Sequence, residues 1–290
     1  MSLNPFDAAV HLPFFGAGDD TLAEIDHAHP AGVVYATDDG PMVAPHVVSA
    51  ARGRLWFPLN RWADERDWLR RNPEVSVLMG ARDGGHVSVA GDVRVLDPLR
   101  PADGFNAIPE VVLSGMATLR YVTDHADGAL SGLRGSRSII NSLPPGTLVA
   151  IRPRRMLRLN RHGDVVRRRG RWSTLMPRPE FPSIEHTVSL RGQPEAALAL
   201  VAGSSPAVVG WAGDDGLVAL PGEWYGQKSE LHVPTSIIDL LATPSTAPIA
   251  VGLANHEGTE RIVLQGTATV TEISPDHTRV AVAIDRLLPG

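Results

Sequence analysis

The stretch 54–97 reads RLWFPLNRWADERDWLRRNPEVSVLMGARDGGHVSVAGDVRVLD and decides the fold. Its first part, 55–57, is a short apolar run with aromatic residues, which is typical of a buried strand. A helix is predicted over 63–71 with Asn60 as its cap, because the first turn is acidic and the last turn is basic, as the helix dipole favours. Asn72-Pro73 ends this helix, since proline disfavours helical geometry in the residue before it.

Two more strands are predicted after the helix. Residues 75–79 alternate in the way of a strand, and 87–95 alternate valine or glycine with other residues over a longer strand, with a turn at Asp83-Gly84-Gly85 between them. The surrounding chain continues the pattern, because further strands are predicted over 32–37, 41–51 and 147–159. The sequence therefore predicts a mainly β fold, a β-barrel with a few helices.

The order of strand, short helix ending in Asn-Pro, strand, hairpin and long valine-rich strand resembles the pyridoxamine 5'-phosphate oxidase-like split-barrel flavoproteins, over residues 30–160. The resemblance implies a six-stranded barrel that pairs with a second barrel and binds a flavin, FMN in the first instance, between the two. In this part of the chain we expect the cofactor to be contacted by His46, Trp56, Asn60, Arg61 and Arg66.

The totals of the chain exclude several classes of protein. It has 290 residues, enough for two ordinary domains, and its net charge of −5 gives no general argument for nucleic acid. There is no cysteine, which excludes thiolate nucleophiles, iron–sulfur clusters, cysteine-ligated zinc and disulfides. No apolar run approaches the roughly 20 residues that a membrane helix needs, and no signal peptide is evident. We expect a soluble, cytoplasmic protein with no membrane partner.

The second part of the chain is predicted to be a degenerate copy of the first. Residues 29–40 match residues 205–216, at an offset of 216 − 40 = 176. The predicted domains are 1–180 and 181–290, and the predicted architecture is two tandem split barrels that form an intrachain pseudo-dimer. A further homodimer stays open.

The first domain carries two additions to the barrel. The first is a helical insertion over 98–145, which either packs on the barrel or covers the ligand as a lid. The second is a basic hairpin over 152–178, which holds ten arginines and a single acid, Asp164. These arginines either bind an anion or, as we prefer, pair with carboxylates of an otherwise acidic chain. Aromatic residues are not interleaved with them, which disfavours nucleic acid.

One position departs from what the resemblance implies. The family commonly places a serine and a lysine, which hold the flavin phosphate, eight to ten residues before the proline that follows the helix. Here 73 − 8 = 65 and 73 − 10 = 63, and these positions hold Glu65 and Ala63. A carboxylate at 65 would repel phosphate, so FMN binding needs Arg61 or Arg66 as a substitute, unless both are ordinary surface residues.

The second copy offers its own group of candidate residues. Two aromatic residues lie close to a lysine, in a chain that is only 5% aromatic. The rings would cover a planar ligand and the lysine would meet an anion, or the aromatic pair would simply pack against the other copy. The eleven histidines are scattered, and no metal site is predicted. The candidates of this copy are Trp224, Tyr225, Lys228, His232 and Ser236.

The function that these observations favour is a flavin-dependent oxidoreductase with FMN or a deazaflavin and a small-molecule substrate. No catalytic residue is assigned, because in flavin chemistry the cofactor carries the hydride. Two alternatives stay open. The first is a non-enzymatic binding protein that has lost the phosphate anchor, and the second is a protein that binds haem or another tetrapyrrole, with His46 or His232 as the axial ligand.

Overall fold

The computed structural model describes residues 22, 24–25, 31–51, 53–59, 63–96, 147–170, 195–213, 216–240, 246–254, 261–275 and 277–289. The predicted insertion over 98–145 and the proline-rich stretch between the two predicted domains lie outside these residues, and so do Asn60 and Arg61.

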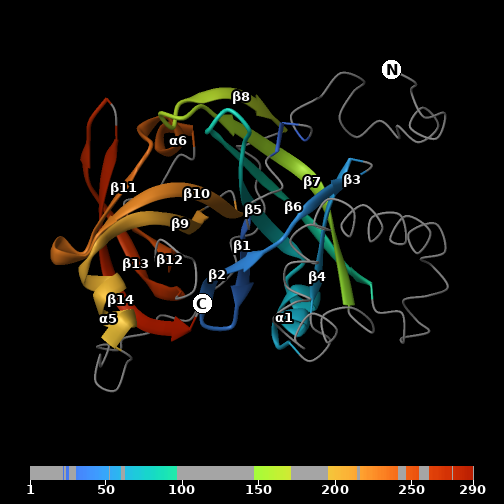
Figure 1. Ribbon diagram of the computed structural model, residues 1–290, viewed down its shortest axis with the longest axis horizontal. Helices are drawn as coiled ribbons and strands as arrows, with labels where there is room; N and C mark the ends of the chain where they lie inside the picture. The colour runs from blue at the N-terminus through green and yellow to red at the C-terminus, as the bar shows by residue number, and fades with distance from the viewer. Residues whose placement is uncertain are drawn as a thin grey trace, which may run out of the picture.

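The strands of the first part of the chain form one sheet, which we call the first sheet (Figure 1). Its neighbours follow the order β2-β1-β5-β6-β7-β4-β3, and β8 pairs with β7 outside this path. Helix α1 (Glu65–Arg71) lies between β4 and β5 in the sequence. The bounds of the strands are β1 Ala31–Thr37, β2 Gly40–His46, β3 Ser49–Ala51, β4 Arg54–Leu59, β5 Glu74–Gly80, β6 His86–Leu96, β7 Thr147–Leu159 and β8 Val165–Arg169.

The strands of the second part form a closed barrel, which we call the second barrel, with the order β10-β11-β14-β13-β12-β9. Its helices are α5 (Glu195–Ala202), α6 (Thr235–Leu240) and the short 3-10 helix η2 (Gly226–Lys228). If β9 takes the place of β1, β10 of β2, β11 of β4, and β12 to β14 of β5 to β7, the strand neighbours are the same in both parts with one exception. The exception is that β11 pairs with β10, whereas β4 pairs with β3. The bounds of the strands are β9 Ser204–Gly213, β10 Gly216–Tyr225, β11 Glu230–Val233, β12 Thr246–Ala254, β13 Arg261–Ile273 and β14 Thr278–Pro289.

Strand β1 shows why the chain is so apolar here, because all seven of its residues are buried. Val33 and Tyr35 point into the core of the first sheet, whereas Val34 and Ala36 point the other way. Successive side chains of a strand alternate between its two faces, so both faces of β1 must be covered. The second face is covered by the second barrel, in a cluster that includes Ala212.

We call this contact between the first sheet and the second barrel the junction. Strands β5, β6, β1 and β2 pack there against β9, β10, β12 and β13. Polar groups also cross it, because Ser88 Oγ donates to the Ala219 carbonyl over 2.7 Å and Ser76 Oγ accepts from the Ala219 amide over 2.9 Å. From the other side, Gln265 Nε2 donates to the Pro41 carbonyl over 2.7 Å. The two parts of the chain therefore form one packed body.

Two glycines lie at corresponding irregularities of the two parts. Gly91 lies at a register shift between β6 and β7, and a Cβ atom there would collide with the Arg152 carbonyl. Gly266 lies at a register shift between β13 and β14, and a Cβ atom there would collide with the Ala283 carbonyl. Only glycine fits such close approaches of two backbones. Gly266 therefore occupies the same place in the second barrel as Gly91 does in the first sheet.

The structure corrects two details of the sequence-based expectations. The strand predicted over 41–51 is broken, because β2 ends at His46 and β3 begins at Ser49. Helix α1 begins at Glu65 with Asp64 at its N-cap position, so the prediction that Asn60 caps it is wrong. The end of the helix is as predicted, since Asn72 caps it and its amide donates to the Trp68 carbonyl. Among the described residues, no helix is long and apolar enough to cross a membrane.

Candidate functional site

The clearest polar cluster of the first sheet surrounds Glu65, in the first turn of α1. Glu65 Oε1 lies 2.8 Å from His46 Nε2, at the end of β2. Its carboxylate also accepts a hydrogen bond from the hydroxyl of Tyr35, on β1. The side chains of His46 and Glu65 are 14% and 13% exposed, so the pair is largely enclosed yet still reachable. Three elements therefore converge on one carboxylate.

Aromatic packing fixes both partners of this carboxylate. The His46 ring lies against Phe57 at 4.5 Å between ring centroids, and the Tyr35 ring stacks on Trp68 at 6.0 Å. Such contacts restrict the rotamers of both rings. Burial raises the pKa of Tyr35, and the neighbouring Glu65 charge raises it further, so the phenol stays protonated and donates its hydrogen. Glu65 is held as an acceptor between two oriented donors.

This arrangement does not fit a phosphate at the start of α1. A bound phosphate needs N–H or O–H donors and positive charge, whereas the group presented here is a carboxylate. Arg66, predicted as a substitute anchor, has its Nε 3.1 Å from Asp67 Oδ1 and is already paired with a carboxylate. The described residues at the start of α1 therefore do not form a phosphate site.

Trp56, another predicted contact of the cofactor, is 1% exposed. It belongs to a small apolar cluster with Leu96 and Ala150, and Leu148 packs against the same cluster. This cluster is separate from the barrel core that contains Phe57, the next residue along β4. The structure therefore places Trp56 on the opposite face of β4 from Phe57, which is the residue that touches His46.

The candidates of the second barrel do not converge on one place. Trp224 is fully buried, and its indole Nε1 donates to the Val201 carbonyl over 2.8 Å, so it is part of the core. Ser236 Oγ donates to the Gly163 carbonyl over 3.1 Å, which ties α6 to the turn between β7 and β8. Lys228 ends the 3-10 helix η2 and is exposed.

Tyr225 and His232 do lie together, and a third ring joins them. The ring centroids of Tyr225 and His232 are 4.3 Å apart, and those of His232 and His277 are 4.5 Å apart. Burial lowers the pKa of His232, and His277 and Arg279 lower it further. The sequence gives no signal for His277, because it lies 277 − 232 = 45 residues away and no motif connects the two histidines. The described residues contain no group of three or more potential metal ligands.

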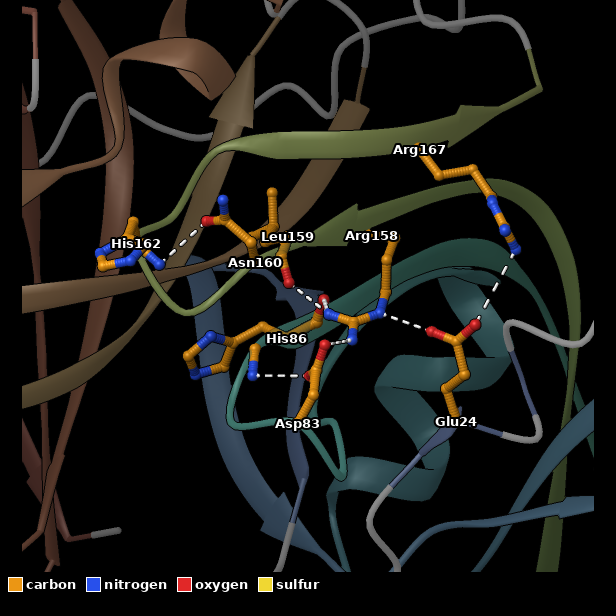
Figure 2. Close-up of polar contacts among 9 residues, drawn as sticks. Glu24, Asp83, His86, Arg158, Leu159, Asn160, His162 and Arg167 are labelled. Carbon is orange, nitrogen blue, oxygen red and sulfur yellow. Dashed lines mark hydrogen bonds and ion pairs between the residues drawn. The ribbon is translucent and has the colours of Figure 1, made fainter.

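In the hairpin formed by β7 and β8, carboxylates pair with Arg154, Arg155, Arg158 and Arg167, as preferred from the sequence. Figure 2 shows Arg158 between two acids, with its Nε 2.8 Å from Glu24 Oε2 and its Nη2 2.5 Å from Asp83 Oδ2. Arg158 also donates to the carbonyls of His86 and Leu159. These contacts raise the pKa of Arg158 against the opposing effect of its burial. The guanidinium therefore ties the turn between β5 and β6 to β7.

A second buried ion pair lies at the junction. Arg155 Nη2 is 3.2 Å from Glu74 Oε1, and their side chains are 7% and 16% exposed. Both groups also reach the second barrel, because Arg155 Nη2 donates to the Leu217 carbonyl over 3.4 Å and Glu74 accepts from the Leu217 amide. Burial raises the pKa of Glu74, while the two nearby arginines, Arg155 and Arg154, oppose this rise.

With this geometry described, the chain was compared with known proteins. No protein family and no curated protein matches the sequence. Solved structures match about half of the chain. A pyridoxamine 5'-phosphate oxidase-related, FMN-binding protein from Nostoc punctiforme is 15% identical, over 55% of this chain and 85% of that one, with a TM-score of 0.34.

Two other matches cover a similar share. An FAD-binding protein from Mesorhizobium loti is 19% identical over 47% of this chain and 89% of that one, with a TM-score of 0.33. General stress protein 26 from Bacillus anthracis is 12% identical over 48% of this chain and 93% of that one, with a TM-score of 0.30. Each of these likenesses extends over about half of this chain.

Proposed function

We propose that this protein is a flavin-type oxidoreductase of the split-barrel class, in which two copies of the barrel within one chain act as the two halves of a dimer. The flavin-type ligand lies where the first sheet meets the second barrel, at the end of β2 that carries His46. The proposal rests on the resemblance of the sequence and on the symmetry of the contacts across the junction. It keeps the predicted division into domains at residue 180.

The contact between equivalent residues is the observation that carries this proposal. A Cβ atom on Gly32 would lie within 2.9 Å of Val208 Cγ2, and one on Gly210 would lie 2.7 Å from Val34 Cγ1. The offsets are 208 − 32 = 176 and 210 − 34 = 176, the same offset that relates the two copies in the sequence. In a two-fold interface, residues on the axis meet their own equivalents. Each of these two pairs joins a glycine to a valine. The valine side chain of one copy therefore fills the space that the glycine of the other copy leaves open.

A second pair of contacts supports the same symmetry. The carbonyls that Gly91 and Gly266 approach belong to Arg152 and Ala283, an offset of 283 − 152 = 131 along the last strands of the two copies. At this offset Arg155 corresponds to residue 155 + 131 = 286, which is also an arginine. Arg155 reaches the start of β10, and Arg286 Nη1 reaches Asp39 Oδ2, just before β2, over 2.6 Å. Each copy therefore holds the first hairpin of the other with an arginine.

The junction between two barrels is where the resemblance places the flavin, and the ring system would supply the redox chemistry when bound. The part of this chain is to orient that ring. His46 lies on β2, which packs against β12 of the second barrel, and its ring is held by Phe57 and Glu65. His46 is thus an oriented hydrogen-bonding group beside the junction.

The test is the visible absorption spectrum of the purified protein, before and after addition of FMN, riboflavin and a deazaflavin. The expected result is a bound chromophore with the two absorption bands of an oxidised flavin, or the single band of a deazaflavin, that stays with the protein through gel filtration. The bound chromophore should be bleached by a chemical reductant and restored by an oxidant without leaving the protein. A protein that retains none of the three ligands would contradict the proposal.

Glu65 favours a second candidate, a binding protein without enzymatic activity. A partly buried carboxylate at the place where the resemblance puts the phosphate anchor is what loss of FMN-dependent activity would leave behind. The two candidates differ in turnover. A bound flavin that is reduced and reoxidised repeatedly by small-molecule donors and acceptors supports the oxidoreductase, whereas a bound flavin that reacts no faster than free flavin supports the binding protein.

A further inference from the structure

We propose that Glu65 makes the α1 end of the first sheet select a ligand without a phosphate, so that among flavins it takes the nucleoside form, riboflavin, in preference to FMN. This inference rests on the proposed function, because it concerns which flavin-type ligand the same site accepts. It arises from the disagreement between the expected phosphate and the groups that the structure presents.

The carboxylate cannot easily turn away from a ligand. Glu65 Oε1 is held by His46 Nε2 at 2.8 Å, and the Tyr35 hydroxyl donates to the same carboxylate. Both donors are themselves fixed by rings, His46 by Phe57 and Tyr35 by Trp68. Moving Glu65 away would leave a buried phenol, 3% exposed, without its acceptor, which is costly.

Two arginines of α1 are paired with carboxylates other than Glu65. Arg66 pairs with Asp67 at 3.1 Å, and Arg71 Nη1 pairs with Asp38 Oδ2 at 3.1 Å. Both cations point to carboxylates other than Glu65. A phosphate at this end would lie beside an enclosed carboxylate.

A dianionic phosphate and a ribityl hydroxyl differ sharply in such a place. Two negative charges a few ångströms apart repel strongly where water is partly excluded. A hydroxyl carries no charge and donates a hydrogen bond to a carboxylate, which is a good acceptor. With its two other donors in place, Glu65 still has lone pairs to accept such a hydrogen bond. The ligand that fits is therefore one whose polar tail consists of hydroxyl or N–H groups.

The experiment is a titration of the full-length protein with riboflavin and with FMN, followed by quenching of flavin fluorescence. We expect riboflavin to bind at least about 10-fold more tightly than FMN, because the Glu65 carboxylate repels the phosphate at close range. In Glu65→Gln the amide keeps the shape of the side chain and removes its charge. FMN affinity should rise by about 10-fold, while riboflavin affinity changes by less than about 3-fold.

Glu272→Gln is the matched control, because it removes the same charge from the far end of β13, where Glu272 pairs with Arg279 at 2.8 Å. It should leave the ratio of the two affinities unchanged. A second measurement uses the unaltered protein alone and covers the case in which Glu65→Gln fails to fold. Raising the salt concentration from about 0.05 M to about 0.5 M screens charge repulsion. The preference for riboflavin should then shrink.

The outcomes separate the two proposals. Equal affinity of the unaltered protein for riboflavin and FMN would overturn this inference and leave the flavin function standing. So would a preference that neither salt nor Glu65→Gln reduces. Binding of neither riboflavin nor FMN would overturn this inference, and failure to bind the deazaflavin as well would overturn the proposed function.

Discussion

The first sheet and the second barrel pair their strands in the same order, yet they differ at one edge. In the second barrel, β10 runs without interruption from Gly216 to Tyr225 and closes the barrel through β11. In the first sheet the corresponding run is broken after His46, and β3 starts again only at Ser49. The first sheet is therefore open at the place where the second barrel is closed.

The first sheet and the second barrel also differ in the side chains that they enclose. Beside the break, the first sheet encloses the charged side chain of Glu65 together with its donors His46 and Tyr35. The second barrel instead fills its interior with large apolar residues, among them Trp211 and Trp224, which are fully buried. The closed second barrel is therefore built as a scaffold, whereas the open first sheet retains the groups that could contact a ligand.

The outer faces differ in the same way at equivalent positions. Position 56 in the first sheet and position 232 in the second barrel are 176 residues apart. The first is Trp56, enclosed among apolar side chains, and the second is His232, whose side chain is 21% exposed between Tyr225 and His277. One strand position thus serves apolar packing in one copy and a stack of polar rings in the other.

The largest effect should come from the scaffold. Trp224→Ala removes a fully buried ring and its hydrogen bond to Val201, and we expect it to lower the free energy of unfolding by about 3–5 kcal/mol. Tyr225→Ala, one residue away on the other face of β10, should cost less than about 1.5 kcal/mol. Urea unfolding followed by circular dichroism measures both. Equal losses for the two variants would break the distinction between core and rim.

The next effect concerns the symmetry of the junction. Gly210→Val places a side chain against Val34 and should cost about 1–3 kcal/mol through overpacking. Combining it with Val34→Gly exchanges the two side chains between equivalent positions and should restore much of the loss. A double-mutant cycle in urea measures this coupling. If the losses of the two single variants simply add, the two residues do not pack against each other as described.

An effect of similar size is expected from one arginine of the hairpin formed by β7 and β8. Arg158→Ala removes a buried guanidinium that donates to two acids and two carbonyls, and should cost about 1–3 kcal/mol. Arg154→Ala removes a side chain that is 45% exposed and pairs with Asp92, so its loss should stay within about 0.5 kcal/mol. Thermal unfolding compares them. A reversed order would show that the hairpin is not held through Arg158.

The smallest effect is the response to acid. Burial lowers the pKa of both His86 and His232 in the folded state. The unfolded chain then binds protons at a higher pH than the folded chain, so stability falls as the pH drops below about 6.5. His86→Asn should reduce this acid sensitivity more than His232→Asn, because His86 is buried more deeply. Thermal melts between about pH 7.5 and about pH 5 measure how steeply stability changes with pH. Equal slopes in the unaltered protein and the two variants would contradict the prediction.

Much of the fold could be predicted from the sequence, because it depends on alternation and on turn residues. The order of strands, the end of α1 at Asn72-Pro73 and the correspondence of Gly266 with Gly91 all have local signals. The break after His46 has none, because the next two residues, Val47-Val48, are good strand formers. The interruption is a property of the tertiary structure.

The candidate site was predicted less completely, since it depends on which face of a strand each residue occupies. The sequence leaves Trp224 either as a cover for a ligand or as packing against the other copy, whereas the register of β10 with β9 and β11 places it in the core. Glu65 was noticed as a departure, whereas its partner Tyr35 is 30 residues away, since 65 − 35 = 30, and lies in a run that is otherwise apolar. Contacts of this kind become visible only once β1, β2 and α1 are placed together.

The measurement that tests this account most directly is amide hydrogen exchange of the protein with and without riboflavin. We expect riboflavin to protect backbone amides from exchange at the end of β2, over residues 42–48, and at the start of α1, over residues 63–69. Exchange on the outer face of the second barrel should change little. Protection confined to the backbone amides around Tyr225, His232 and His277 would contradict this expectation, because the ligand would then bind to the second barrel and not beside Glu65.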